Sequence, residues 1–575
     1  MPGAIGPRES LPNGIIETPP VRSTTLTIRR LPGSYVERPE FQPRVPNGGA
    51  NGAWLPCVSQ YCVDPLQVER GSLDGPFVAS RSETLAAIGQ GRSSWSLAST
   101  SAVTESLRRL ENPDARMVVT GQQPGFLGGP LLTVFKAVTA IALASRLERE
   151  QGTPWIPVFW IASEDHDLEE VRPVRLPSSR GTETFELPGN ADRRPLSEHV
   201  IDAEVQAIAA AVQAHLADRR HGEEIAELLD CYATDGTRHL GSAFAALLES
   251  LFASHGLVVV APEWLRTTSL PVVRRALERP DEILECISAG IAEVRGAGLR
   301  PQVRPRFPLF HLERGDDGIL RRHHMTPRDG GFEIDGTGAR LSADDAVETL
   351  EREPASFSPG VLLRAVVQQA CLPVGLAVGG PAELAYFAQS GPLFEHFGLS
   401  QTPMTVRLHG AMIEGKVARA IRRLGPEDTL FEALTRSSEM RDVVVSETSD
   451  TSSELSQLSS ELQERLDRVV DRALDGVQLA EDQERRLRRG GKKIVDELER
   501  FGRRLERMSA TADEERLAAA RLLWTTLFPD GGVQERRWSA LHFISKYGRA
   551  WIDDLIEAVA QDPDTTDHRW IYFED

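Results

Sequence analysis

The chain reads Thr120-Gly-Gln-Gln-Pro-Gly-Phe-Leu-Gly-Gly-Pro-Leu-Leu-Thr-Val-Phe-Lys136 and, shortly afterwards, Pro157-Val-Phe-Trp-Ile-Ala-Ser-Glu-Asp-His-Asp167. The apolar run 117–119 predicts a strand before the glycine-rich turn, and apolar residues recur at helical spacing over 131–147. Residues 155–162 are few and almost all apolar, which is typical of a strand buried in a parallel sheet. Together these segments predict a βαβ unit and an α/β fold.

Four ionisable residues, Glu164-Asp-His-Asp167, follow the second predicted strand. In open parallel sheets ligands bind at the carboxyl ends of the strands, where this cluster would lie. Carboxylates around a histidine suit general acid–base chemistry, and we predict Glu164, Asp165, His166 and Asp167 as catalytic residues. A divalent cation held by the carboxylates is a second interpretation. A helix amino terminus, capped by the first acids, would explain only part of the cluster.

The glycine-rich turn opens the predicted helix, and Pro130 suits its first turn. Successive backbone N–H groups at such a position can hold a phosphate or a carboxylate, although an ordinary tight turn is the alternative. The residues that we predict to bind substrate or nucleotide here are Gly121, Gln122, Gln123, Gly128, Gly129, Thr133 and Lys136.

A second strand, predicted over 374–378, also runs into Gly-Gly-Pro, so the same turn is expected twice. Gly379, Gly380, Glu383 and Tyr386 follow it and are predicted to face the same crevice. Arg364 and Arg407 could each grip a carboxylate through two hydrogen bonds, and a structural ion pair is the equal alternative for either. His323 and His324 stand in a predicted hairpin and are expected to be exposed, whereas Cys371 is expected to be an inert core thiol.

Composition limits the functional class. The chain has 575 residues, which predicts about two to four domains, and its net charge of −19 argues against binding a nucleic-acid backbone. Its five cysteines are scattered and odd in number, which favours a reducing cytoplasm over a disulfide framework. The first fifty residues lack the apolar core of a signal peptide, and no run of apolar residues is long enough to span a membrane.

Four regions are predicted. Residues 1–50 are rich in proline and glycine and are expected to form a disordered or loosely docked tail. Residues 51–425 carry a Rossmann-like, doubly wound core in the manner of nucleotidyltransferases, with insertions at about 172–200 and 300–345. A helical coiled-coil region is expected over 426–510, and 511–575 is expected to return to the core.

The coiled-coil prediction depends on two apolar stripes. Leu455, Leu458, Leu462 and the apolar residues after them repeat with an eleven-residue period, and a heptad seam runs from Leu487 through Ile494 to Met508. Two such helices cannot bury their stripes alone. We therefore predict an antiparallel hairpin that pairs with a second subunit, and a hairpin lying on its own core domain is the alternative.

The segments quoted above resemble those of the bacillithiol biosynthesis cysteine-adding enzymes, and the likeness runs from about residue 50 to the end. Further matching segments are Ser358-Pro-Gly-Val-Leu-Leu-Arg364, Val378-Gly-Gly-Pro-Ala-Glu-Leu-Ala-Tyr-Phe387, Pro403-Met-Thr-Val-Arg407, Gln534-Glu-Arg536 and Lys546-Tyr-Gly548. The family commonly has an acidic residue where this chain has Gln369, so no role is assigned to that position.

This resemblance implies a ligase that joins the carboxyl group of cysteine to the amine of glucosaminyl-malate. Activation of a carboxylate implies ATP or ADP, with Mg²⁺ as an optional partner, and the family's members imply a coiled-coil homodimer. The negative charge and the absence of a long apolar run predict neither nucleic acid nor membrane as partner. Three alternatives stay open: another nucleotide-dependent transferase on the same fold, a non-catalytic coiled-coil partner of the pathway's enzymes, and, as the weakest, a metal-dependent hydrolase.

Overall fold

A computed structural model describes residues 21–22, 26–34, 62–68, 75–178, 181–233, 238–298, 301–425, 430, 451–474, 481–565 and 567–573. The chain divides into two compact units. The first contains Met1–Met412 together with Pro529–Asp575, and the second contains Ile413–Phe528. The first unit is therefore built from two separate stretches of sequence, and the second is inserted between them.

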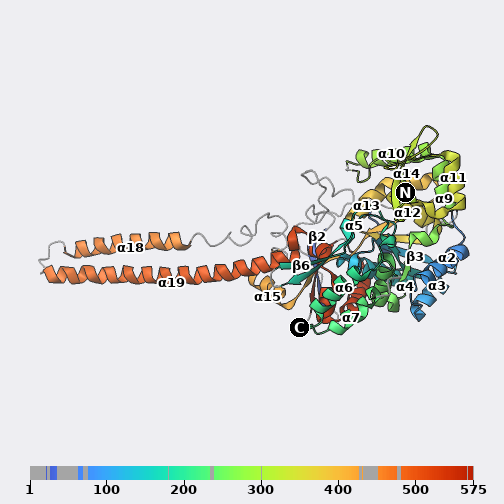
Figure 1. Cartoon of the computed structure of the whole chain (residues 1–575). Coiled ribbons are helices and arrows are strands. Elements are labelled where there is room, and N and C mark those ends of the chain that lie inside the picture. The colour runs from blue at the N-terminus through green and yellow to red at the C-terminus, as the bar shows by residue number, and fades with distance from the viewer. Residues whose placement is uncertain are drawn as a thin grey trace. The chain divides into compact units, whose positions relative to one another are not determined.

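A parallel sheet of five strands forms the centre of the first unit (Figure 1). Across the sheet the order is β14 (Met404–Val406), β13 (Val374–Gly379), β3 (Arg116–Gln122), β4 (Trp155–Ile161) and β7 (Val258–Val260). Every pairing between neighbours is parallel, and all seven residues of β4 are buried. The predictions of a buried parallel strand over 155–162 and of an α/β core are confirmed.

Helix α4 (Leu132–Gln151) joins β3 to β4, as the apolar spacing over 131–147 predicts, and α8 (Leu240–Phe252) precedes β7. The Gly-Gly-Pro turns, in contrast, differ from each other. A short 3₁₀ turn at Phe126–Gly128 separates β3 from the first one, and Gly128 and Gly129 have φ of +90° and +67°. The second leads directly from β13 into α13 (Pro381–Phe387), and Gly380 has φ of −84°. The expectation of one turn used twice is therefore wrong.

Both predicted insertions are present. Residues 173–186 form an antiparallel hairpin of β5 (Pro173–Ser178) and β6 (Gly181–Glu186). The second insertion belongs to an antiparallel sheet of β11 (Arg340–Ser342), β10 (Gly331–Ile334), β9 (Leu320–Arg328), β8 (Leu309–Arg314) and β12 (Phe357–Pro359). Its two hairpins turn at Gly315-Asp-Asp-Gly318 and at Asp329-Gly-Gly331. His323 is only 9% exposed and the His324 side chain only 14% exposed, so the prediction of an exposed histidine pair is wrong.

The remaining helices of the first unit surround these sheets. They are α2 (Arg81–Ser94), α3 (Ser101–Arg109), α5 (Leu168–Val171), α6 (Ala203–Leu216), α7 (Gly222–Leu229), α9 (Leu270–Glu278), α10 (Pro280–Gly296), α11 (Ala343–Arg352), α12 (Val361–Cys371), α14 (Gly391–His396), α20 (Gln534–Arg537), α21 (Ala540–Tyr547) and α22 (Ala550–Gln561). Trp538, Phe543 and Trp551 of the last stretch belong to the same hydrophobic cluster as Phe126 and Phe135.

Part of the predicted tail is a strand. β2 (Leu26–Ser34) lies between β1 (Val21–Arg22) and β16 (Asp567–Phe573), and β15 (His409–Ile413) completes this sheet. Leu26 and Ile28 are buried and alternate with less buried residues, as on a half-buried strand. The tail prediction is therefore wrong for residues 26–34.

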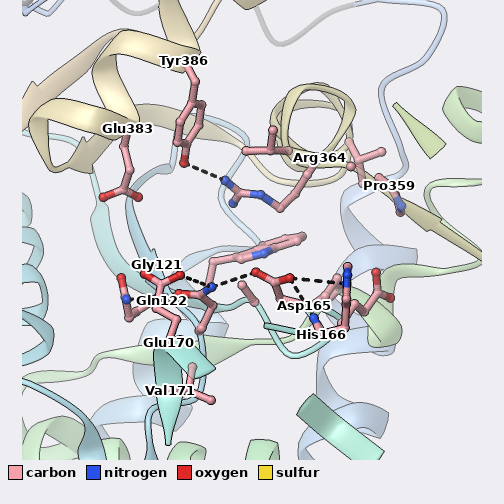
Figure 2. Close-up of a pocket in the computed structure, with 18 of the residues that line it drawn as sticks. Gly121, Gln122, Asp165, His166, Glu170, Val171, Pro359, Arg364, Glu383 and Tyr386 are labelled. Atoms are coloured by element: carbon pink, nitrogen blue, oxygen red, sulfur yellow. Dashed lines mark hydrogen bonds and ion pairs between the residues drawn. The ribbon is translucent and has the colours of Figure 1, made fainter. Parts of the chain in front are cut away.

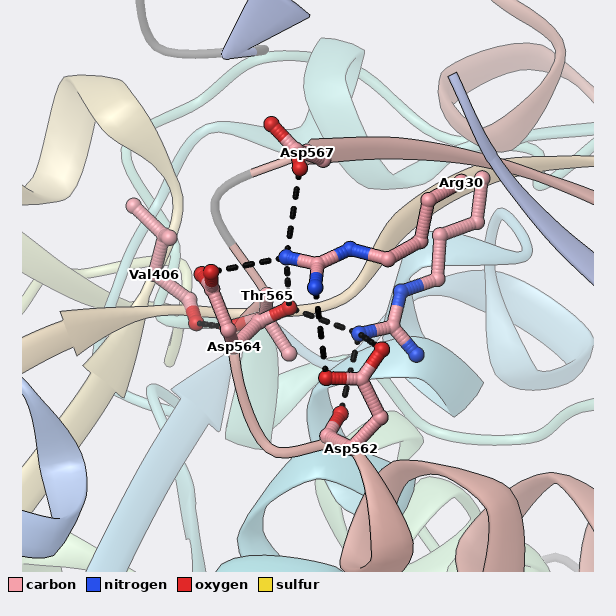
Figure 3. Close-up of polar contacts among 7 residues, drawn as sticks. Arg30, Val406, Asp562, Asp564, Thr565 and Asp567 are labelled. Atoms are coloured by element: carbon pink, nitrogen blue, oxygen red, sulfur yellow. Dashed lines mark hydrogen bonds and ion pairs between the residues drawn. The ribbon is translucent and has the colours of Figure 1, made fainter. Parts of the chain in front are cut away.

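Ion pairs tie β2 to the chain's other end (Figure 3). The Arg30 guanidinium lies 2.7 Å from Asp564, 3.2 Å from Asp567 and 3.4 Å from Asp562. The Thr565 hydroxyl next to them donates to the carbonyl of Val406. These contacts join three segments that lie far apart in the sequence.

The second unit contains α15 (Gly415–Leu424) and two long helices, α18 (Thr451–Leu474) and α19 (Glu481–Leu527), which run side by side (Figure 1). An ion pair of 2.8 Å joins Arg488 to Asp471 across the hairpin, and a Cβ on Gly491 would lie 3.8 Å from the Cβ of Leu466. The predicted antiparallel hairpin is present, and α19 continues well past the expected end at residue 510. In the described part of the chain no helix is both long and apolar enough to cross a bilayer.

Candidate active site

A cavity of about 600 Å³ lies at the carboxyl ends of the parallel strands (Figure 2). Gly121 and Gln122 end β3, the Glu164–His166 segment follows β4, Gly380 follows β13 and Arg407 follows β14; all of them line the cavity. The switch from strand to loop at this edge is where doubly wound sheets bind ligands. The cavity therefore lies where the sequence predicts the site.

The strand end of β3 has no room for a side chain. A Cβ on Gly121 would lie 2.7 Å from the carbonyl oxygen of Trp160 on the neighbouring strand β4. The carbonyl of Gly121 accepts a hydrogen bond from Lys136 at 2.6 Å. Glycine at this position thus lets β3 approach β4 closely just where the cavity begins.

Glu164 is buried and held by two partners. It forms an ion pair with Arg266, and the Ser358 hydroxyl donates to its Oε2 at 2.6 Å. The neighbouring Ser163 hydroxyl donates to Glu263 at 2.6 Å, and burial together with the charge of Glu164 raises the pKa of Glu263 to about 7. Glu164 is therefore a fixed charge in the cavity wall.

Asp165 and His166 face the cavity (Figure 2), whereas Asp167 is not among the residues that line it. The Gln123 amide donates to Asp165 Oδ2 at 2.8 Å, and the same amide donates to Glu170 at 3.0 Å. Asp167 is exposed, and it caps α5 by accepting the backbone N–H of Glu170 at 3.3 Å. The predicted catalytic group thus loses one member, because the helix cap is Asp167 rather than the earlier acids.

Arg322 of β9 reaches His166 from the inserted sheet. Its Nη1 lies 3.4 Å from His166 Nδ1 and 3.8 Å from Asp165 Oδ1, and its guanidinium stacks 3.7 Å from the centre of the Phe310 ring. Burial and the charge of Arg322 lower the pKa of His166, against the opposing effect of Asp165. The imidazole is therefore neutral near pH 7.

The opposite wall carries Arg364, Tyr386 and Glu383 (Figure 2). Arg364 Nη2 donates to the Tyr386 hydroxyl at 3.4 Å, and among the described residues no carboxylate forms an ion pair with Arg364. Burial raises the pKa of the Tyr386 hydroxyl, which keeps it protonated. This wall therefore offers a guanidinium and a hydroxyl to a ligand.

Lys136 lies in the cavity wall, where it forms a buried ion pair with Glu383 that we call the strut. Its ammonium group lies 2.7 Å from Glu383 and donates to the Gly121 carbonyl at 2.6 Å and to the Gln122 side chain at 2.8 Å. Burial lowers its pKa against the charge of Glu383. Burial alone would raise the pKa of Glu383, but the charge of Lys136 lowers it. The three donors of Lys136 are all used, so it joins the two glycine turns.

The predicted anion cradle at the first glycine turn is not formed. The N–H groups of Gly125, Gly128 and Gly129 donate to carbonyls of the same turn, and that of Leu127 donates to the Tyr232 hydroxyl. Gly128, Gly129 and Thr133 also do not line the cavity. The turn uses its donors to hold its own shape, as in the alternative of an ordinary tight turn.

The second turn is closed in a similar way. The Gly380 N–H donates to Glu383 Oε2 at 2.8 Å, which caps α13. Gly379 lies against Met404, outside the cavity lining. Only Gly380 borders the cavity, and a Cβ there would meet nothing nearer than 3.5 Å.

Arg407 is a structural residue. It is 1% exposed, and it pairs with the fully buried Glu535 at 2.6 Å and donates to the Leu408 carbonyl at 2.7 Å. Burial would raise the pKa of Glu535, but the charge of Arg407 holds it well below its usual value. Burial and the same charge lower the pKa of His409 to about 3. The structural ion pair, one of the two interpretations of Arg407, is therefore the one found.

The sequence analysis missed several cavity residues, among them Glu170, Arg266, Phe310, Arg322 and Arg536. Arg536 is the one with a usable signal, because it belongs to the quoted Gln534-Glu-Arg536 segment. A Cβ on Gly380 would lie 3.9 Å from Arg536 Nη2, which places this guanidinium at the mouth of the second turn. Within the described residues no set of three or more His, Cys, Asp or Glu side chains converges as a metal site.

Two family models match most of the chain. The family model described as "Bacillithiol biosynthesis BshC, N-terminal Rossmann-like domain" matches residues 77–408, and "Bacillithiol biosynthesis BshC, C-terminal coiled-coil domain" matches residues 411–573. A solved structure titled "putative arginyl t-RNA synthetase from Campylobacter jejuni" covers 81% of this chain and 97% of its own at 12% identity, with a TM-score of 0.21, which supports no argument.

Curated relatives carry one name, "Putative cysteine ligase BshC". The protein of Salinibacter ruber is 30% identical over 79% of this chain and 83% of its own length. Those of Heliobacterium modesticaldum and Solibacter usitatus are 29% and 31% identical over 80% of this chain and 84% and 86% of theirs. The chain belongs to the bacillithiol biosynthesis BshC family.

Proposed function

We propose that this protein is a cysteine ligase of bacillithiol biosynthesis, which forms an amide between the carboxyl group of cysteine and the amine of glucosaminyl-malate. Membership of the family and the shared name of the relatives support a cysteine ligase. We infer glucosaminyl-malate as the acceptor of cysteine from the resemblance of the sequence segments to those of the family. The cavity supplies the chemistry that such a reaction needs.

One observation carries the proposal: two chemically different walls face each other across the cavity (Figure 2). One wall presents the Asp165 carboxylate and the neutral His166, a pair that can take part in transferring the proton from an attacking amine. The other presents Arg364 and Tyr386, with Arg536 at its edge, which can hold a carboxylate. Glucosaminyl-malate carries both an amine and carboxylates, so it could span the two walls.

Amide formation in water requires an activated carboxyl group, and we propose a nucleoside triphosphate as the co-substrate. The N–H groups of the glycine turns already donate to acceptors within the protein, so the turns do not favour phosphate binding. Among the cations that line this cavity, Arg364 and Arg536 are the two that we expect to meet a phosphate. Bound nucleotide would supply the leaving group, and the protein's own residues would hold the reactants and exclude water.

The test is product formation by the purified protein from cysteine, glucosaminyl-malate and ATP, followed by mass spectrometry. Asp165→Asn should abolish the product, because it removes the carboxylate at the reacting end of the cavity. Asp167→Asn is the matched control: it changes an identical side chain two residues away that lies outside the cavity, and it should keep near-normal rates. Equal loss in both variants, or no product from the unmodified protein, would contradict the proposal.

The two main alternatives give different outcomes in the same assay. A different nucleotide-dependent transferase would hydrolyse or bind nucleotide yet reject glucosaminyl-malate. A non-catalytic partner would tolerate Asp165→Asn in cells but would fail when the helical hairpin is deleted. The contacts of Asp165 with the Gln123 amide and with the buried Arg322 favour the ligase, since a scaffold has no use for a carboxylate held in this way.

We also propose a homodimer formed through the helical hairpin. Leu458, Val469, Ile494 and Phe501 are each at least half exposed, and Ile494 and Phe501 border a groove together with Leu462 and Leu498. Apolar side chains at heptad spacing favour a second copy as their cover. Replacing Ile494 and Phe501 by Glu should halve the mass measured by analytical ultracentrifugation, whereas Lys493→Glu in the same groove should leave it unchanged. An unchanged mass in the double variant would contradict this dimer.

The four described cysteines are free, and burial raises the pKa of the Cys371 thiol to about 12. Unreactive free thiols and small-molecule substrates favour the cytoplasm, which we propose as the location.

A further inference from the structure

Arg322 is immobilised in the cavity wall. Its side chain is 8% exposed, its Nε donates to the Ser358 hydroxyl at 3.1 Å and its Nη2 donates to the Pro359 carbonyl at 2.9 Å. The Phe310 ring covers one face of its guanidinium at 3.7 Å. With these contacts on three sides, the remaining Nη1 is directed at His166.

This contact decides where His166 carries its proton. A guanidinium has only N–H donors, so the Nδ1 that faces Nη1 at 3.4 Å presents its lone pair to it; the carboxylate oxygen near this nitrogen, Asp165 Oδ1, lies 3.8 Å away, beyond hydrogen-bond distance. A neutral imidazole has one N–H, which then belongs to Nε2. The described residues offer Nε2 no hydrogen-bond partner, and the His166 side chain is 34% exposed on the cavity wall. The open position of His166 is therefore a donor.

The same arrangement discourages His166 from taking a second proton. That proton would have to enter Nδ1, between the ring and a permanently charged guanidinium. The carboxylates of Asp165 and Asp167 oppose this effect, and the buried ring nevertheless has a lowered pKa. Asp165 is the cavity-facing group next to His166 that can accept a proton without gaining positive charge.

We propose that His166 acts as a neutral hydrogen-bond donor through Nε2 rather than as the base, and that Arg322 is the positioning residue that fixes this tautomer. The catalytic part rests on the proposed ligase function. The amine nitrogen bonds to the acyl carbon of a phosphate-activated carboxyl group, and the bond from that carbon to the leaving oxygen breaks, with the electron pair staying on the oxygen. The amine proton passes to Asp165, and His166 donates to the acyl oxygen as it becomes negative.

The tautomer can be measured without any reaction. Nitrogen-15 NMR of histidine-labelled protein, with His166 signals identified by their loss in His166→Gln, should show an unprotonated Nδ1 and a protonated Nε2. Arg322→Gln should give a mixture of tautomers and raise the pKa of His166. Arg321→Gln, which removes an adjacent guanidinium paired with Asp317, should change neither. A protonated Nδ1 in the unmodified protein, or no change in Arg322→Gln, would overturn the assignment.

Kinetics separates donor from base. Glutamine keeps an N–H donor near the Nε2 position but cannot take up a proton, so His166→Gln should retain activity within about tenfold of the unmodified protein, whereas loss of a base costs about 10²–10⁴-fold. His166→Ala, which removes the donor, should lose about 10²–10³-fold. Equal, large losses in both variants would refute the donor role. If the unmodified protein forms no product, the ligase proposal fails, while the NMR result still decides the tautomer.

Discussion

The buried strut of Lys136 and Glu383 gives the sharpest stability prediction. Lys136 is 3% exposed and has three acceptors within 2.8 Å, one of which is the Glu383 carboxylate. Lys136→Met removes the cation, leaves the Gly121 carbonyl and the Gln122 side chain without their donor, and leaves Glu383 without its counter-charge. Breaking a buried pair from one side costs about 3–5 kcal/mol. We expect about 4 kcal/mol, because Glu383 is 25% exposed and partly hydrated while two neutral acceptors are also lost.

The double variant tests whether the two residues act as one unit. Glu383→Gln keeps an oxygen for the Gly380 N–H and removes only the charge, so we expect a loss of about 2 kcal/mol. Lys136→Met with Glu383→Gln leaves no unpaired charge, and its loss should be about 4 rather than 6 kcal/mol, a coupling energy of about 2 kcal/mol.

Urea unfolding followed by tryptophan fluorescence measures these free energies. Among the described tryptophans only Trp524 lies in the second unit, so the signal reports mainly on the unit that holds the strut. Glu170→Gln, an exposed carboxylate at the same cavity, is the control and should stay within about 0.5 kcal/mol of the unmodified protein. Additive losses, with a coupling energy below about 0.5 kcal/mol, would refute the claim that Lys136 and Glu383 stabilise the fold as one unit.

Three further changes have defined outcomes. Gly380→Ala should leave the melting temperature unchanged, since its Cβ meets nothing nearer than 3.5 Å, yet weaken binding of carboxylate ligands in isothermal titration; unchanged binding would mean that ligands do not approach this turn. Arg407→Met should cost at least about 3 kcal/mol in urea unfolding, because Glu535 is fully buried, and a smaller loss would show that His409 and the Gly410 N–H suffice for its charge. Glu263 has a folded pKa of about 7, above its unfolded value, so the unfolded chain loses this proton first as pH rises. Stability should therefore fall by up to about 1.4 kcal/mol per pH unit between roughly pH 5 and 7. Glu263→Gln should flatten that slope, and equal slopes in both proteins would contradict the raised pKa.

Local sequence patterns predicted the central sheet well, because apolar spacing reports directly on a buried strand or helix. The apolar run at 155–162 needed no distant partner to be predicted correctly as a buried strand. β2 was missed because its pairing strand β16 lies at the other end of the chain. Its alternating residues, Leu26-Thr-Ile-Arg29, stand within a proline- and glycine-rich region that favours a tail.

The site shows the same limit. A glycine-rich turn shows in the sequence which N–H groups could bind a ligand, but not which acceptors they already have. The glycine N–H groups use carbonyls of the turn itself, whereas Leu127 uses the distant Tyr232 and Leu131 uses the Trp538 carbonyl. Nothing in the local sequence announces these partners. Arg322 was missed for the related reason that an inserted hairpin carries it to a cluster that follows β4.

The division of the first unit into two stretches has a consequence for how the protein is made. Trp538, Phe543 and Trp551 belong to the same hydrophobic cluster as Phe126 and Phe135, and β16 pairs with β2. While the ribosome is still adding the helical hairpin, the core around Phe126 lacks these side chains and exposes an apolar face. Domains fold as units, so this one can close only after its last strand has emerged. The nascent chain therefore needs protection from aggregation for nearly the whole of its synthesis, and truncation before residue 567 should leave it a client of chaperones.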